Sequence, residues 1–374
     1  MRRVGFTSIQ NAQTVYAEGY TVPPLRTGYE RVMAQRVDAT YAIAARDSGK
    51  VIAIDNDHIE VEYSNGDTES YALGKIFGKA AGETIPHYIV TDHKVDDSFI
   101  KGEVIGYNKM FFERDVLDPK QVVYKSAVLA TVALVQSQDT FEDSSAISLD
   151  LARKLKTRVS KPRTIKVKFD QQIRGLMEVG SITDLESILC TIEDQTAGNT
   201  DIFDERSLAT LKLLSNKTPR AKYVGEIEKI EVFYNGDIEQ MSSSLAILAK
   251  LYNKRRKVYC EKMGIPKTTN EVEVGTRIQG QPMDPDSMIV VVYITEIVQM
   301  AQADKLVFGN QLKSTVGRVM TGTNSTAEGE PLDALFGYQG INNRIVPSAL
   351  LMGTSNTLSK LLGNQAVKAY RGGQ

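Results

Sequence analysis

The stretch that decides the fold is residues 288–320, MIVVVYITEIVQMAQADKLVFGNQLKSTVGRVM. Its first ten residues, 288–297, form a nearly unbroken β-branched and apolar run, which is too short to cross a membrane and predicts a fully buried strand. Two lysines follow, Lys305 and Lys313, on either side of Gly309 in a segment whose Gly, Asn, Ser and Thr content predicts irregular backbone. A buried strand that leads to paired lysines can hold positive charge near a phosphate, because an ammonium group is a mobile point charge with three donors. The alternative is two solvated lysines on a loop.

Length and composition predict a soluble intracellular protein of two or three domains. The 374 residues have enough apolar content for a core, and the formal net charge of −1 argues against a free-standing DNA-binding protein with a basic surface overall. A local basic channel is compatible with that charge. Two cysteines and three histidines form neither a disulfide framework nor a zinc spacing, so we expect no zinc. The first residues lack the apolar core of a signal peptide, and no stretch approaches the ~20 apolar residues of a membrane helix, so we expect no membrane partner.

Residues 50–73 predict a scaffold of three short strands. Apolar and polar residues alternate from 50 to 55 and from 58 to 63, and Asn65-Gly66 predicts a hairpin turn before the third strand. His58 is interpreted as a surface histidine beside acidic residues, and neither of the other two histidines has the spacing of a metal ligand.

Two further stretches carry candidate functional residues. A Val/Leu/Ala-rich run at 128–135 predicts a buried strand, and Glu142 and Asp143 follow it, where adjacent carboxylates are usually a cap or a solvated turn. Residues 153–168 hold eight basic residues and no acid, so they are candidates for contact with a nucleic-acid backbone. The alternatives are a solvated face or a surface for a partner subunit. The candidate nucleic-acid-binding side chains are Arg153, Lys154, Lys156, Arg158, Lys161 and Arg163.

The segment ADKLVFGNQLKSTVGRVM, residues 303–320, resembles the most characteristic segment of the β subunit of multisubunit DNA-directed RNA polymerases. In that family a Gly-Asp-Lys is followed, at this spacing, by a second lysine. Here Lys305 and Lys313 match the two lysines, and Ala303 stands in place of the glycine. The string Phe-Glu-Asp-Ser at 141–144, followed by Ile-Ser at 147–148, resembles a second motif of the family.

Further matches follow the family's order along the chain. They include Pro24-Leu25-Arg26 and Thr27-Gly28-Tyr29-Glu30, which resemble the family's Pro-Leu-hydrophobic-Arg and Thr-Gly-Met-Glu elements, and a Val-Pro-Ser at 346–348. Ala349 stands where the family has an arginine that binds triphosphate, and Arg344 is a candidate substitute for it. Arg3 is the nearest counterpart of another family arginine that contacts the triphosphate of the incoming nucleotide.

The resemblance implies a mainly β fold with helices (α+β), in which a double-psi β-barrel is interrupted by a β-rich flap or wall domain. The implied divisions are an N-terminal hybrid-like region at 1–114, the first part of the barrel at 115–154, the flap or wall insertion at 155–285, and the second part of the barrel with the lysine loop and C-terminal tail at 286–374. The matches cover the C-terminal half of a normal β subunit without its terminal clasp. That extent resembles the split, divergent β subunits of giant (jumbo) bacteriophages.

The implied function is that of a non-autonomous subunit of a DNA-directed RNA polymerase that transcribes phage genes. Two Mg²⁺ ions would support nucleotidyl transfer, held mainly by a partner subunit, with no ligand supplied directly by this chain. Lys305 and Lys313 would neutralise phosphates, and Glu142 and Asp143 would orient a metal ion through water.

The implied partners are the other polymerase subunits (an N-terminal β part and β′ parts), a promoter-specificity factor, the DNA template, the RNA product and nucleoside triphosphates. The implied location is the cytoplasm of the infected bacterial host or the virion. Two alternatives stay open: a catalytically degenerate structural subunit of a polymerase assembly, and an unrelated β-rich virion structural protein.

Overall fold

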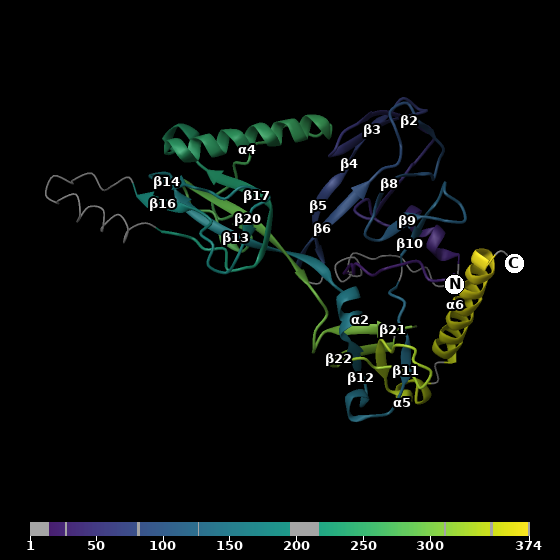
Figure 1. The fold of residues 1–374 in the computed structure, drawn as a ribbon. Coiled ribbons are helices and arrows are strands. Elements are labelled where there is room, and N and C mark those ends of the chain that lie inside the picture. Colours follow the sequence, from purple (N-terminus) through teal and green to yellow (C-terminus); the bar gives the residue numbers. More distant parts are fainter. Residues whose placement is uncertain are drawn as a thin grey trace.

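The structure is a computed structural model that describes residues 15–26, 28–80, 83–125, 127–194, 217–309, 312–344 and 347–372. These residues form a mixed α+β fold with many strands in several sheets and four α-helices, which confirms the mainly β, α+β part of the predicted fold class. None of the sheets in the described part of the chain closes into a barrel. Figure 1 shows three lobes, one around α4, one around β2 to β10 and one around β12 and β22.

The largest sheet has eight strands, and its centre is the strand predicted from the apolar run. This strand, β20 (Ser287–Val298), pairs antiparallel with β13 along one side and with β17 along the other. Every residue from 287 to 295 is buried. Alternate side chains enter different cores, since Val290 and Val292 pack in one cluster while Ile289 and Val291 pack in another. Because both faces are covered, the sequence is apolar throughout instead of alternating with polar residues.

The large sheet draws strands from three of the four predicted domains. Its order is β1-β8-β6-β13-β20-β17-β15, with β5 added on β6. The sheet therefore does not follow the predicted divisions at 114/115, 154/155 and 285/286, and the domain limits stay a prediction. The other strands of the sheet are β1 (Ala42–Ala44), β5 (Gly74–Ala80), β6 (Glu83–Val90), β8 (Val104–Asn108), β13 (Thr157–Lys168), β15 (Ile182–Thr183) and β17 (Gly225–Asn235).

The predicted three-stranded scaffold is confirmed, with bounds that differ by one residue from the prediction. It comprises β2 (Gly49–Ile54), β3 (His58–Tyr63) and β4 (Thr68–Ala72), and β7 (Ser98–Phe99) adds to the edge. Gly66 has φ +85° in the turn between β3 and β4, as a tight Asn-Gly turn requires.

A long helix and several small elements complete the first two lobes. Helix α4 (Ser243–Lys262) packs Leu245 and Ala249 onto the core of the large sheet, and its far end reaches the turn between β2 and β3 (Figure 1). The small strands are β9 (Phe112–Arg114), β10 (Val122–Tyr124), β14 (Gln171–Arg174), β16 (Thr191–Asp194), β18 (Arg277–Ile278) and β19 (Gln281–Pro282). The 3₁₀ helices of these lobes are η1 (Tyr29–Arg31), η2 (Met33–Gln35) and η4 (Ile238–Gln240), whereas η3 (Gln138–Thr140) packs against β12 and β22 in the third lobe.

The third lobe is a five-stranded mixed sheet in the order β11-β23-β12-β22-β21. It joins two distant segments, because β11 (Val132–Leu134) and β12 (Ser144–Ser148) pair in parallel with β23 (Ala334–Phe336) and β22 (Leu312–Met320), respectively. Strand β12 also pairs antiparallel with β23, and β21 (Lys305–Phe308) pairs antiparallel with β22. Helix α2 (Leu149–Lys154) follows β12 and covers one face of the sheet with Leu151 and Ala152.

Two predictions for this lobe were wrong. The run at 128–135 contains only the three-residue strand β11, which lies at the edge of the sheet and leaves Val132 36% exposed. An edge strand has a neighbour on one side alone, so its side chains are less covered than those of a central strand. The lysine segment is a β-hairpin rather than irregular backbone, because β21 and β22 pair over four residues.

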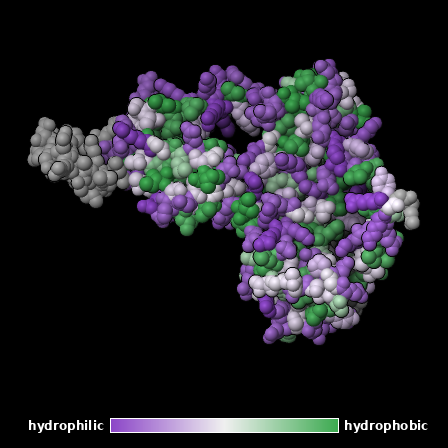
Figure 2. Space-filling model, viewed as in Figure 1, coloured by the Kyte–Doolittle hydropathy of each residue, from purple (hydrophilic) through white to green (hydrophobic). Residues whose placement is uncertain are grey.

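The chain continues through α5 (Tyr338–Asn342) and the 26-residue helix α6 (Pro347–Gly372). None of the described residues of α6 is buried, and its exposed apolar side chains include Leu351, Leu362 and Tyr370. On the face shown in Figure 2, hydrophilic and hydrophobic residues are interspersed over all three lobes. No described helix combines the length and the apolar character needed to cross a membrane.

Candidate active site

The hairpin β21–β22 directs both candidate lysines to one exposed face. Lys305 pairs with Thr315 and Lys313 pairs with Val307, and paired residues of an antiparallel ladder point to the same side of the sheet. The two residues that flank Lys313 on β22, Leu312 and Ser314, point to the opposite face and are buried. The hairpin thus has one buried face against the lobe core and one face that presents two ammonium groups to solvent.

The start of the hairpin is fixed by backbone contacts around Ala303. The Ala303 N–H donates to the Val316 carbonyl at 2.8 Å, and the Val316 N–H donates to the Asp304 carbonyl at 2.9 Å. Ala303 has φ +76°, a left-handed conformation that glycine adopts at little cost and other residues rarely adopt. The resemblance had aligned this position with a glycine, so the backbone here has the conformation that a glycine would favour.

The candidate carboxylates lie beside the lysine strand, immediately before β12. The Asp143 carbonyl accepts a hydrogen bond from the Thr315 N–H at 2.9 Å and another from the Ser314 Oγ at 2.8 Å. These two donors follow Lys313 directly in the chain. Glu142 has φ +51°, and both acidic side chains are exposed. Such a backbone outlier costs on the order of 1–3 kcal/mol and is more frequent at functional sites than elsewhere.

Arg344 joins the same group of residues. Its Nη2 lies 2.8 Å from the Asp143 Oδ1, and the two side chains are 48% and 56% exposed. The first turn of α6 lies at the tip of the hairpin, because a Cβ built on Gly309 would be 3.8 Å from the Cβ of Ala349. Ala349 is the position that the resemblance aligned with a triphosphate-binding arginine, and Arg344 is the arginine that the structure brings to this edge of the sheet.

The cationic side chains of the site differ in whether a carboxylate neutralises them. Among the described residues, no carboxylate lies within 4.0 Å of the ammonium group of Lys305 or Lys313, whereas the charge of Arg344 is offset by Asp143. The site can therefore attract an anionic group such as a phosphate to the lysines by electrostatics. The carboxylates Glu142 and Asp143 add the oxygen ligands that Mg²⁺ prefers.

The basic run at 153–168 is largely neutralised by acids from other parts of the chain. Five of the six candidate side chains form ion pairs, and the sixth, Arg163, donates from Nε to the Arg220 carbonyl at 3.0 Å. Its role in nucleic-acid binding stays a prediction. The pairs are Arg153–Asp150 (3.4 Å), Lys154–Asp333 (3.8 Å), Lys156–Glu18 (2.9 Å), Arg158–Glu228 (3.4 Å) and Lys161–Glu296 (2.5 Å).

One predicted site residue, Arg3, lies outside the described residues. Conversely, the structure brings together a group that the sequence analysis missed, Asp55, Asp57 and His58. The interpretation of His58 as a surface histidine was wrong, since its side chain is 9% exposed. The signal available in the sequence was two aspartates and a histidine within four residues at a predicted turn.

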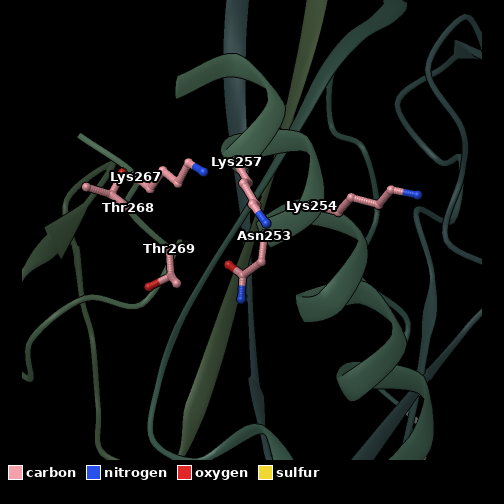
Figure 3. A pocket seen from close by; sticks show the side chains of 6 residues that line it. All are labelled: Asn253, Lys254, Lys257, Lys267, Thr268 and Thr269. Carbon is pink, nitrogen blue, oxygen red and sulfur yellow. The ribbon is translucent and has the colours of Figure 1, made fainter. Parts of the chain in front are cut away.

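A further open pocket lies beside α4 and is lined by Asn253, Lys254, Lys257, Lys267, Thr268 and Thr269 (Figure 3). Lys254 points away from Lys257 and Lys267, so the three ammonium groups do not converge on one point. Lys267 is also paired with Glu261 at 2.9 Å. The pocket therefore lacks the converging donors of an anion site.

No protein-family model matches the chain, and no curated protein matches it.

Proposed function

We propose that this chain is a non-autonomous subunit of a multisubunit DNA-directed RNA polymerase and contributes β-side residues to template-directed nucleotidyl transfer. The observation that carries the proposal is that three separate stretches of the sequence meet at one sheet: Asp143 accepts hydrogen bonds from Ser314 and Thr315, the two residues after Lys313, and forms an ion pair with Arg344. Each of these stretches resembles a different motif of the polymerase β family.

In this function the two lysines neutralise the phosphates of the RNA end and of the incoming nucleotide. Their exposure and lack of carboxylate partners among the described residues suit a role in which the negative charge arrives with the substrate. Arg344 would bind phosphate in a different way from the lysines, because a guanidinium binds phosphate through two parallel hydrogen bonds. Its Nη2 donates to the Asp143 Oδ1, so a phosphate would compete with Asp143 for this guanidinium.

The Mg²⁺ ions of such a reaction would be held mainly by a partner subunit and would lower the barrier by stabilising the attacking and leaving oxygens. Glu142 and Asp143 fit an indirect role, because both are exposed carboxylates and one oxygen of Asp143 is engaged by Arg344. They would orient the metal ions through water.

The finer fold and the partners belong to the same proposal. A double-psi β-barrel built from 115–154 and 286–374, around a flap or wall at 155–285, is supported by a mixed sheet whose strands come from both segments. Helix α6, which has no buried residue, supports the need for partner chains. The partners proposed are the other polymerase subunits and a promoter-specificity factor, in the cytoplasm of a phage-infected bacterium or in the virion.

The test is primer extension on an RNA–DNA scaffold by the assembly purified through a tag on this chain. Lys305→Ala and Lys313→Ala should each assemble normally and extend at least ~100-fold more slowly, which equals about 2.7 kcal/mol of barrier. Arg318→Ala is the matched control. Arg318 lies on the same strand as Lys313, but its guanidinium forms an ion pair with Asp139. The assembly with this variant should extend the primer at the wild-type rate.

Other outcomes separate the alternatives. Variants that assemble and extend at the wild-type rate would exclude a catalytic role for the lysines and leave a structural subunit. A purified chain that assembles only with itself, without template-directed synthesis, would contradict the polymerase function and favour a virion structural protein.

A further inference from the structure

A second group of converging polar side chains lies at the turn between β2 and β3, in a different lobe from the lysine hairpin. The turn is held by backbone hydrogen bonds on both sides. The Asp55 N–H donates to the His58 carbonyl at 2.9 Å, and the Leu73 N–H donates to the Asp57 carbonyl at 2.9 Å. The side chains of this turn therefore start from a fixed backbone.

The donor atoms of Asp55, Asp57 and His58 have the spacing of metal ligands. The His58 Nδ1 lies 3.1 Å from the Asp55 Oδ2 and 3.6 Å from the Asp57 Oδ1, and the three donor atoms all lie within 4.8 Å of one another. Ligands bound tetrahedrally at about 2.0–2.1 Å from a metal ion lie about 3.4 Å apart. The two measured distances bracket that value.

The buried imidazole is the second observation that points to a ligand. The His58 side chain is 9% exposed, and its Nδ1 has no hydrogen-bond partner although two carboxylates face it. An imidazole nitrogen and two carboxylate oxygens thus converge at one point with no hydrogen bond satisfying the imidazole nitrogen. Such a pocket is stabilised by a cation.

A cation of the protein already lies at this pocket. The Lys262 ammonium, from the last residue of α4, is 2.8 Å from the Asp57 Oδ1 and 3.0 Å from the Asp55 Oδ2. Its proximity holds the pKa of the Asp57 carboxyl below its usual range. Two carboxylates carry one more negative charge than Lys262 can neutralise, whereas a divalent ion would balance both.

We propose that Asp55, Asp57 and His58 form a binding site for a divalent transition-metal ion, for which the Lys262 ammonium is the competing occupant. A nitrogen ligand with two carboxylates suits ions of the Zn²⁺, Co²⁺ and Mn²⁺ class, while Mg²⁺ prefers oxygen ligands alone. A fourth position is open to water. Metal binding displaces Lys262 from the carboxylates and so releases the end of α4 from the turn between β2 and β3.

The site is tested by titrating the full chain with Zn²⁺ in a calorimeter at neutral pH, and with Co²⁺ by visible absorption. The wild type should bind one Zn²⁺, and His58→Ala and Asp57→Asn should each lower the affinity at least tenfold. The matched control is His93→Ala. His93 also lies near two acids, but its Nδ1 and Nε2 are each 3.9 Å from a different carboxylate, on opposite sides of the ring, so this variant should bind as the wild type does.

Lys262→Met tests the competition directly. Removal of the ammonium should raise Zn²⁺ affinity at least fivefold, equal to about 1 kcal/mol, whereas a purely structural ion-pair cluster predicts no gain. The proposal is overturned if the dissociation constant of the wild type for Zn²⁺ is above about 100 μM. It is also overturned if His58→Ala and Asp57→Asn bind Zn²⁺ as the wild type does, or if Lys262→Met has an unchanged or lower affinity. Circular dichroism verifies folding, and the exposed Asp57 provides a second variant should His58→Ala fail to fold.

Discussion

The buried carboxylate of Glu228 is predicted to stabilise the contact between the first two lobes. Glu228 lies on β17 with a side chain that is only 1% exposed. Its Oε1 is 2.8 Å from the Lys75 Nζ on β5 and 3.4 Å from the Arg158 Nη1 on β13. Its Oε2 accepts a hydrogen bond from the Thr295 Oγ1 on β20 at 2.8 Å. The Tyr88 hydroxyl on β6 also donates to its Oε1 at 3.5 Å, so one carboxylate connects five strands of the large sheet.

Glu228→Gln keeps the shape of the side chain and removes its charge. Breaking a buried ion pair by removing one partner costs about 3–5 kcal/mol. Lys75 and Arg158 are 32% and 37% exposed, so water recovers part of that cost. We expect the free energy of unfolding to fall by about 2–3 kcal/mol, of which about 1 kcal/mol comes from weakening the bond to Thr295.

The assay is urea unfolding followed by far-ultraviolet circular dichroism and by tyrosine fluorescence, since the chain has 16 tyrosines and no tryptophan. The control is Glu226→Gln, two residues earlier on the same strand, because Glu226 is exposed and forms no ion pair with any described residue. The control should change the free energy of unfolding by less than about 0.5 kcal/mol. Equal effects of the two variants would refute the assigned role of the buried carboxylate.

Three further predictions use the same unfolding assay. Burial lowers the pKa of His87 to about 4 from an ordinary value of 6.5, and its neutral Nδ1 faces the Asn108 amide at 2.9 Å. The folded protein binds this proton more weakly than the unfolded chain does. The free energy of unfolding is therefore highest above pH 6.5 and falls by about 3 kcal/mol as the pH drops toward 4. In His87→Phe, most of this loss should disappear. Ala303→Gly should raise the free energy of unfolding by about 0.5–1 kcal/mol, because glycine accepts φ +76° without strain; a loss of stability would contradict the left-handed backbone there. Gly337→Ala should lower it by about 1–3 kcal/mol, because the added Cβ would lie 2.5 Å from the Thr140 carbonyl oxygen; an unchanged value would show that this contact can relax.

Elements with a strong local signal could be predicted from the sequence. Strand β20 is one, because the seven consecutive apolar residues at 288–294 are typical of a strand that is covered on both faces. The hairpin at 58–72 is another, because Asn65-Gly66 specifies its turn.

What depended on distant pairing could not be predicted. The Gly, Asn, Ser and Thr content of the lysine segment predicts a loop, whereas its pairing with β12, more than 160 residues earlier in the chain, makes it a strand. Neither the ion pair between Asp143 and Arg344 nor that between Asp57 and Lys262 has a local signal, since each joins residues about two hundred positions apart. Such pairs depend on the packing of whole lobes.

The connection between the two halves of the five-stranded sheet has a consequence for biosynthesis. Strand β12 ends at Ser148, and its parallel neighbour β22 begins at Leu312. A ribosome adds about 5–20 residues per second, so roughly ten to thirty seconds separate the two strands as the nascent chain emerges. During that interval Ile147, fully buried in the finished sheet, has no partner strand to cover it. The growing chain therefore exposes an unpaired apolar edge that a chaperone can bind, and an interrupted translation product would retain that edge permanently.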